Sequence, residues 1–210
     1  MNDFGDAFLA AVDMIASFDK DLSEIIGLSL SVSLSAVIIA AIIGLPLGAS
    51  MALFRFPGRT ITVVILNAFM GLPPVVVGLI VYLLLSRAGP FGVLGLLFTP
   101  TAMIIAQVIL VTPIIASLTR QVMEDLWQEY EEQMRSLGAG PMRSLTALLW
   151  DGRFSLLTAV LAGFGRASAE VGAVMIVGGN IDHATRVMTT AIALEVSKGD
   201  LTLALGLGFV

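Results

Sequence analysis

Two residues of opposite charge stand inside an otherwise apolar stretch of the chain. Arg166 and Glu170 lie four residues apart within the run from Phe154 to Val177, which is long enough to cross a membrane. On one helix they would be neighbours on the same face. Ionisable groups at membrane depth are costly and usually face a bundle interior or a wet cavity. We therefore expect the two to be paired, with each other or with another copy of the chain, as a structural ion pair or as an ion relay.

The sequence lacks the residue sets of the common catalytic and metal sites. It has no cysteine and a single histidine, His183, which excludes disulfides, thiolate metal sites and a histidine cluster within one chain. No Ser/His/Asp set lies at membrane depth, which argues against an intramembrane hydrolase. No Gly-x-x-x-x-Gly-Lys-Ser/Thr motif occurs, so any ATP must be handled by another polypeptide. We expect a chain that catalyses no reaction and binds no cofactor or metal itself.

The composition places the chain in a membrane. Of its 210 residues, 57% are hydrophobic and only 13% are charged, which is too apolar for a typical soluble domain of this size. The formal net charge is −5 and the few Lys and Arg residues are scattered, so we expect no nucleic acid partner. The fold class that follows is all-α and polytopic, with membrane lipid around it.

Four apolar runs are long enough to cross a membrane, and a fifth is shorter. They cover residues 25–54, 61–86, 100–119 and 154–177, and the short run covers 201–210. Ten helical residues rise about 15 Å, so we expect the last run to open a fifth span that continues beyond Val210. Asp21 and Glu24 have the form of a capping box, which places the start of the first span near Leu22. We expect residues 1–20 to form a surface helix and residues 21–210 to form the transmembrane domain.

Two further features interrupt the apolar pattern. Pro73 and Pro74 fall in the middle of the second span, where they remove two backbone donors and bend or break the helix. A packed kink and a break that lines a pathway remain equally open. The polar segment from Ile181 to Asp200 should lie outside the bilayer, with a short helix from Met188 to Val196.

A polar segment from residue 120 to residue 153 is the one extended island between the spans. Apolar residues recur at helical spacing between Gln121 and Leu137, which predicts an amphipathic helix there. Gly138, Ala139, Gly140 and Pro141 then combine a glycine stop signal with a proline suited to a first helical turn. We expect a tight turn and a second helix from about Met142 to Trp150.

This island resembles the cytoplasmic "EAA" loop of ABC-importer permeases, a helix-turn-helix that docks on the ATPase subunit. Glu132, Leu137, Gly138 and Ala139 match the pattern, whereas Gln133 and Met134 replace its two alanines. The resemblance implies that Glu132 and the turn Gly138-Ala139-Gly140-Pro141 couple the chain to an ATPase. The alternative is an ordinary solvated hairpin between two spans.

Two other segments resemble the molybdate-, tungstate- and sulfate-type permeases. They are Gly71-Leu-Pro-Pro-Val-Val-Val-Gly78 and the longer stretch from Phe164 to Asn180, and residues 189–200 look closest to tungstate permeases. The resemblance implies a type I importer fold and an ATP-driven path for an oxyanion, tungstate before molybdate or sulfate. It places Pro73, Pro74, Arg166, Glu170 and Asn180 in the path or in an intramembrane pair. It also implies an ATPase subunit, an extracytoplasmic binding protein and a second copy in a homodimer.

The basic residues indicate an orientation. With the polar island inside, six Lys and Arg residues would be cytoplasmic and four external; the first set is Arg55, Arg59, Arg120, Arg135, Arg143 and Arg153, and the second is Lys20, Arg87, Arg186 and Lys198. We expect an external N-terminus in a bacterial or archaeal cell membrane. The rival function is an ion-coupled secondary transporter that uses Arg166 and Glu170, although five spans without an internal repeat would be unusual for one.

Overall fold

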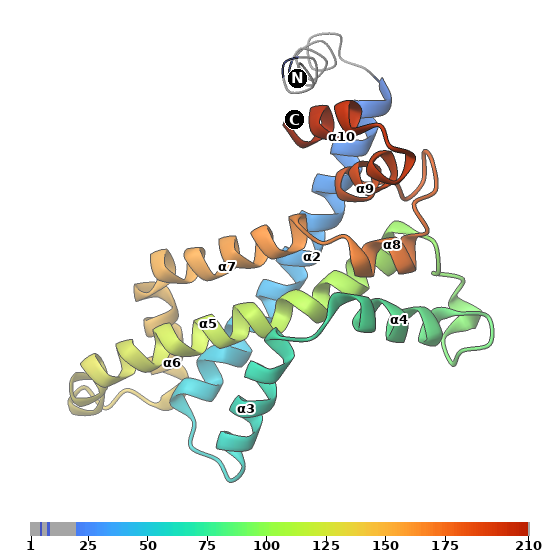
Figure 1. Cartoon of the computed structure of the whole chain (residues 1–210). Helices are drawn as coiled ribbons and strands as arrows, with labels where there is room; N and C mark the ends of the chain where they lie inside the picture. Colours follow the sequence, from blue (N-terminus) through green and yellow to red (C-terminus); the bar gives the residue numbers. More distant parts are fainter. Residues whose placement is uncertain (1–4, 6–7, 9–19, 210) are drawn as a thin grey trace. The chain divides into compact units, whose positions relative to one another are not determined.

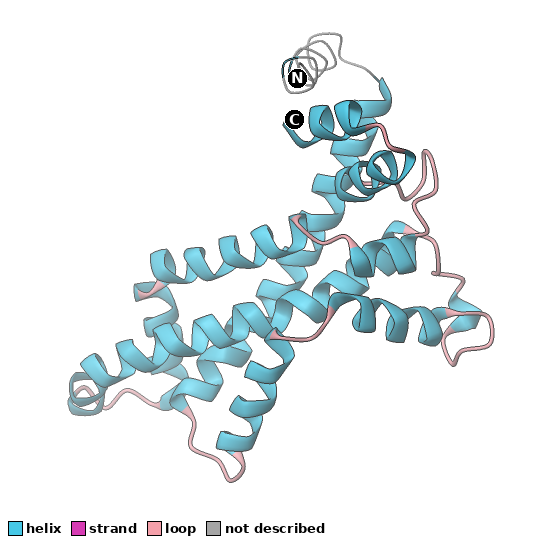
Figure 2. Ribbon diagram, viewed as in Figure 1, coloured by secondary structure: helices cyan, strands magenta, loops and turns pink. Residues whose placement is uncertain are grey.

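The structure is a computed structural model that describes residues 5, 8 and 20–209 (Figure 1). Those residues form helices joined by loops, and no strand occurs among them (Figure 2). The helices are α2 (Lys20–Leu53), α3 (Arg59–Met70), α4 (Pro74–Leu85), η1 (Gly92–Leu94), α5 (Pro100–Ser136), α6 (Pro141–Asp151), α7 (Arg153–Ser168), α8 (Gly172–Gly178), α9 (Met188–Lys198) and α10 (Leu201–Phe209). The surface helix expected within residues 1–20 lies largely outside the described residues.

The chain forms two compact units, and each is assembled from segments far apart in the sequence. Unit 1 comprises residues 1–34, 74–107 and 168–210, and unit 2 comprises residues 35–73 and 108–167. The long helices α2 and α5 therefore contribute residues to both units.

Unit 1 is built on close helix contacts. An added Cβ at Gly78 of α4 would lie 2.7 Å from the Cα atom of Ala173 in α8, so only a glycine permits this approach. Leu22 of α2 forms a buried cluster with Ala191 of α9 and Leu207 of α10. The backbone N–H of Met188 donates to the hydroxyl of Ser29 at 2.7 Å, which fixes the start of α9 on α2.

The core of unit 2 lies between α2, α5 and α7. It contains Val37 and Ala40 of α2, Val111 and Ile115 of α5, and Ala167 of α7. A Cβ added at Gly48 of α2 would lie 2.2 Å from the carbonyl oxygen of Ala116 in α5. The small residues therefore bring the two long helices into backbone contact, as is usual for helices in a membrane.

Among the described residues, α2 and α5 are each long and apolar enough to cross a membrane. Up to four spans result if α3 with α4, and α6 with α7, each count as one broken span. The first and third expected spans are thus confirmed as helices. The fourth is wrong as a single helix, because α7 ends at Ser168 and α8 begins only at Gly172. The expected capping box is also wrong, because α2 already includes Asp21 in its first turn.

Candidate functional site

The polar island forms the expected helical hairpin, with one difference in its first helix. Helix α5 runs without interruption from Pro100 to Ser136, so the third span and the helix expected from Gln121 are one element. Gly138 has φ +65°, as the glycine stop signal predicts, and the N–H of Ala139 donates to the carbonyl of Met134 at 2.9 Å. Pro141 is the first residue of α6, after an extended Gly140.

The second helix of the hairpin is held against the ends of the two long helices. Met123 of α5, Leu145 and Leu148 of α6, and Ala49 and Ala52 of α2 form one buried cluster, which we call the coupling core. Apolar contact of this kind is the main force that fixes an amphipathic helix. The position of α6 therefore depends on α2 and α5 together.

The outer surface of the hairpin exposes large apolar side chains among charged side chains of both signs. Leu137, Met142 and Trp150 are 80%, 66% and 72% exposed, and Glu132 is exposed as well. The pKa of the Tyr130 phenol is raised above its ordinary value. The negative charge of Glu129 is the main cause, followed by the charge of Asp151 and by burial. Large apolar side chains rimmed by polar ones typically mark an interaction surface.

The two prolines of the second span produce a break. Helix α3 ends at Met70, and α4 begins at Pro74, the first residue of the new helix. Gly71 and Leu72 close the end of α3 through N–H bonds to the carbonyls of Ala68 and Phe69. The expected interruption is therefore confirmed as a complete break of the helix.

Arg166 and Glu170 do not share a helix face as expected. Arg166 lies in the last turn of α7 and is half-buried, whereas Glu170 lies in the connection to α8 and is only 4% exposed. The Glu170 carboxylate accepts the N–H of Ala173 at 3.0 Å, and its backbone carbonyl accepts the hydroxyl of Thr189 at 2.9 Å. Glu170 thus positions the start of α8 and links it to α9.

Asn180 lies in a strained loop after α8. Its φ is +50°, and its buried Oδ1 has no hydrogen-bond partner within the part of the chain that the structure describes. Thr185, which is fully buried, fastens this loop: its hydroxyl donates to the carbonyl of Gly178 at 2.5 Å and accepts the N–H of Ile181 at 2.9 Å. The sequence pattern marked Asn180 but not Thr185 or Thr189, since an isolated threonine carries no motif.

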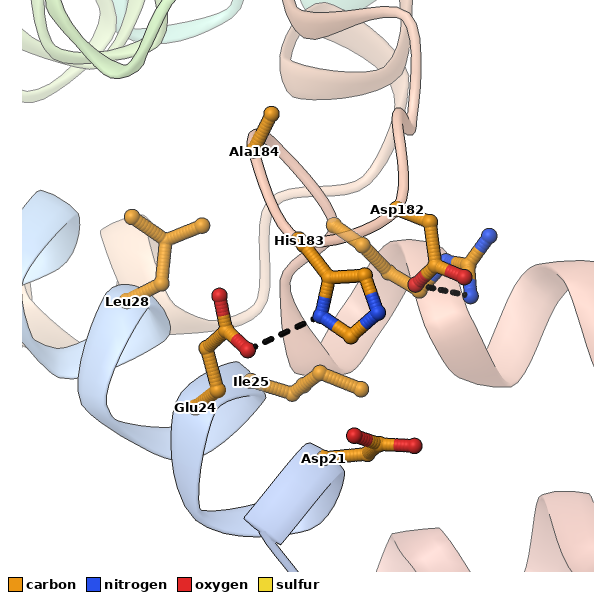
Figure 3. Close-up of a pocket in the computed structure, with 8 residues that line it drawn as sticks. Asp21, Glu24, Ile25, Leu28, Asp182, His183 and Ala184 are labelled. Atoms are coloured by element: carbon orange, nitrogen blue, oxygen red, sulfur yellow. Dashed lines mark hydrogen bonds and ion pairs between the residues drawn. The ribbon is translucent and has the colours of Figure 1, made fainter.

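A polar corner lies where the same loop meets the first turns of α2 (Figure 3). His183 Nδ1 is 3.0 Å from Glu24 Oε2, and Arg186 donates to Asp182 at 2.7 Å. The hydrogen bond to Glu24 raises the pKa of His183 above its ordinary value, and the charges of Asp182, Glu24 and Asp21 act in the same direction. The described residues contain no cluster of three or more side chains placed to hold a metal ion.

Residues 44–193 match the family described as binding-protein-dependent transport system inner membrane component. The tungstate uptake system permease protein TupB of Peptoclostridium acidaminophilum is 42% identical over 210 residues, which cover 100% of this chain and 92% of that protein. TupB of Campylobacter jejuni is 36% identical over 98% of this chain and 86% of its own length. The sulfate transport system permease protein CysW of Synechocystis is 29% identical over 99% of this chain and 78% of its own length. The chain therefore belongs to the binding-protein-dependent inner membrane components, the non-catalytic permease subunits of ABC importers.

Proposed function

We propose that this chain forms the transmembrane path of an ABC importer for tungstate. The observation that carries the proposal is the 42% identity, over the whole chain, to a permease named for tungstate uptake. The sulfate permease is less similar at 29% identity, which favours tungstate over sulfate. Permeases of this family work with an ATPase and a binding protein, and the binding protein makes the first choice of anion.

The helical hairpin is the docking site for the ATPase. Glu132, Gly138, Ala139, Gly140 and Pro141 form its turn and the approach to it. Two observations support this role: Gly138 adopts a positive φ that shapes a sharp corner, and the apolar side chains around it are left exposed. The chain thus offers a rigid knob with an uncovered surface.

Two copies of the chain enclose the anion path between them. The described residues provide up to four spans, which are too few to surround a hydrophilic path alone. Pro73 and Pro74 break one span, and Asn180 carries a buried oxygen without a described partner in the loop after α8, so these residues line the path. Arg166 and Glu170 form intramembrane pairs rather than facing lipid. The N-terminus is external and the hairpin is cytoplasmic, in agreement with the distribution of basic residues.

Transport then proceeds by alternating access. Closure of the ATPase subunits on ATP moves the hairpin, and the two permeases rock so that the cavity opens outward. The binding protein releases tungstate into this cavity. ATP hydrolysis resets the hairpin, and the anion leaves toward the cytoplasm.

Reconstitution in vesicles tests the proposal. We expect tungstate to accumulate only when the permease, its ATPase, its binding protein and ATP are all present, and an excess of sulfate should compete poorly. The matched control is an ATPase subunit that binds ATP but cannot hydrolyse it. Accumulation by vesicles that contain this chain alone would refute the proposal, and uptake that collapses with a proton uncoupler would favour a secondary transporter.

A further inference from the structure

Glu124 of α5 is held by two arginines from different parts of unit 2. An Nη atom of Arg59, at the start of α3, donates to Glu124 Oε1, and Arg120 of α5 donates to Glu124 Oε2 at 2.5 Å. The side chains of Arg59, Glu124 and Arg120 are 32%, 27% and 13% exposed, so water screens the ion pairs only in part. Both carboxylate oxygens are engaged, and each binds a different guanidinium.

Arg59 also makes a third connection, to the end of α2. Its Nε donates to the backbone carbonyl of Met51 at 2.7 Å. Met51 lies within the last turn of α2, where the helix leaves its carbonyls without partners. A cation at this position is also favoured by the helix dipole. One arginine therefore joins α2, α3 and α5, and the planar guanidinium gives these contacts a defined direction.

This network adjoins the coupling core. Met123, the residue before Glu124, is fully buried against Ala49 and Ala52 of α2 and against Leu145 and Leu148 of α6. Apolar contacts hold these helices together, but the hydrophobic effect behind them has no preferred direction. Charge-assisted hydrogen bonds are directional, because they weaken steeply when the angle between donor, hydrogen and acceptor changes.

We propose that Glu124 is a positioning residue for energy coupling: its ion pair with Arg59 clamps the turn between α2 and α3 to α5, and Arg120, which lies on α5 itself, holds the Glu124 carboxylate in place. With the clamp closed, a push on α6 moves the unit 2 parts of α2, α3 and α5 as one body. Without it, α6 still docks and still moves, but the turn at residues 54–58 slips and the push is lost. The proposal rests on the docking of the hairpin on the ATPase.

The effect of the clamp on coupling is measured as the ratio of tungstate transported to ATP hydrolysed. We expect Glu124→Gln and Arg59→Gln each to lower this ratio roughly fivefold, because both lose the Arg59–Glu124 ion pair between helices, and the loss of one such pair shifts a conformational equilibrium by about that factor. The control is Glu131→Gln, which removes an ion pair to Arg135 at 2.6 Å within α5 that joins no second helix. This control should keep the wild-type ratio, and all three variants should still copurify with the ATPase.

A covalent link between positions 59 and 124 distinguishes a positioning role of the ion pair from a role in the stability of the fold alone. The chain has no cysteine, so Arg59→Cys with Glu124→Cys introduces its only two thiols. We expect this double variant to be uncoupled, and a short bifunctional thiol reagent that joins the two positions should restore most of the ratio. A wild-type ratio in Glu124→Gln, or a joined protein that remains uncoupled, would overturn the clamp. Failure of the proposed function looks different, because the wild type itself would then transport without the ATPase.

Discussion

The turn of the hairpin depends on one glycine. Gly138 has φ +65°, where a residue with a Cβ atom is strained, and no described atom lies within 4 Å of the place that a Cβ would take. The effect of a substitution is therefore one of backbone strain and not of a clash. Strain of this kind costs about 1–2 kcal/mol, more for a β-branched residue.

We expect Gly138→Val to uncouple the permease from its ATPase. The variant should insert into the membrane normally, because the spans are unchanged, but it should retain less ATPase on copurification and show less ATP hydrolysis in response to the binding protein. The control is Gly140→Ala, since Gly140 has φ −68° and equally open surroundings. If Gly138→Val behaves like Gly140→Ala, the hairpin is only a connection between spans.

His183 reports on the polar corner through its pKa. The contact with Glu24 raises this pKa above the ordinary value of 6.5, so the contact stabilises the folded chain at pH values below 6.5. That contribution is lost as the pH rises through the folded-state pKa. We expect Glu24→Gln to lower the pKa of His183, measured by NMR on the single histidine ring. Glu195→Gln, which removes a partner of Lys198, should leave it unchanged; equal pKa values in both variants would contradict the contact.

At the scale of the helices, α4 and α8 can approach only because Gly78 lacks a side chain. The Cβ of an alanine there would meet the Cα of Ala173 at 2.7 Å, and a backbone atom cannot move aside as a side chain can. We expect Gly78→Ala to destabilise the protein by about 1–3 kcal/mol and to lower its Tm in detergent. Gly27→Ala in α2 has no neighbour within 4 Å and should leave Tm unchanged or slightly higher. A Gly78→Ala protein with the wild-type Tm would contradict this account.

Helices with local signals were predictable, and a break set by distant contacts was not. Pro141 and Met188 begin α6 and α9 close to the expected positions, because the signals that start a helix act over a few residues. The break between α7 and α8 has no such signal. It depends on the Glu170 carboxylate and on Thr189, which lies 19 residues further along the chain.

The candidate site divides in the same way. Gly138 was found because glycine and proline mark a turn by themselves. Glu124 could not be found from the sequence, since it is one carboxylate among several on a helix face predicted to be solvated. Its significance comes from Arg59, 65 residues earlier in the sequence, and only the packing of α3 near α5 brings the two together. Residues that act in pairs across the fold leave no pattern within a single window of sequence.

At the scale of the whole chain, many large apolar side chains are left uncovered. Ile42 of α2, Ile61 and Val64 of α3, and Leu83 of α4 are each more than half exposed. In water such surfaces would cause aggregation, whereas lipid tails or another subunit can cover them without cost. This is what an inner membrane component of a larger transporter requires.

The interleaving of the two units has a consequence for biosynthesis. Unit 2 has all of its segments once residue 167 has left the ribosome, whereas unit 1 must wait for α8, α9 and α10. Until then the first turns of α2 and the whole of α4 lack the helices that bury them, and they depend on lipid or on an insertion factor. Cutting the gene between the units is impossible, because neither unit is encoded by a continuous stretch. Split versions should therefore cut within a loop such as residues 86–91, to which no coupling role is assigned, and rely on reassembly of the fragments in the membrane.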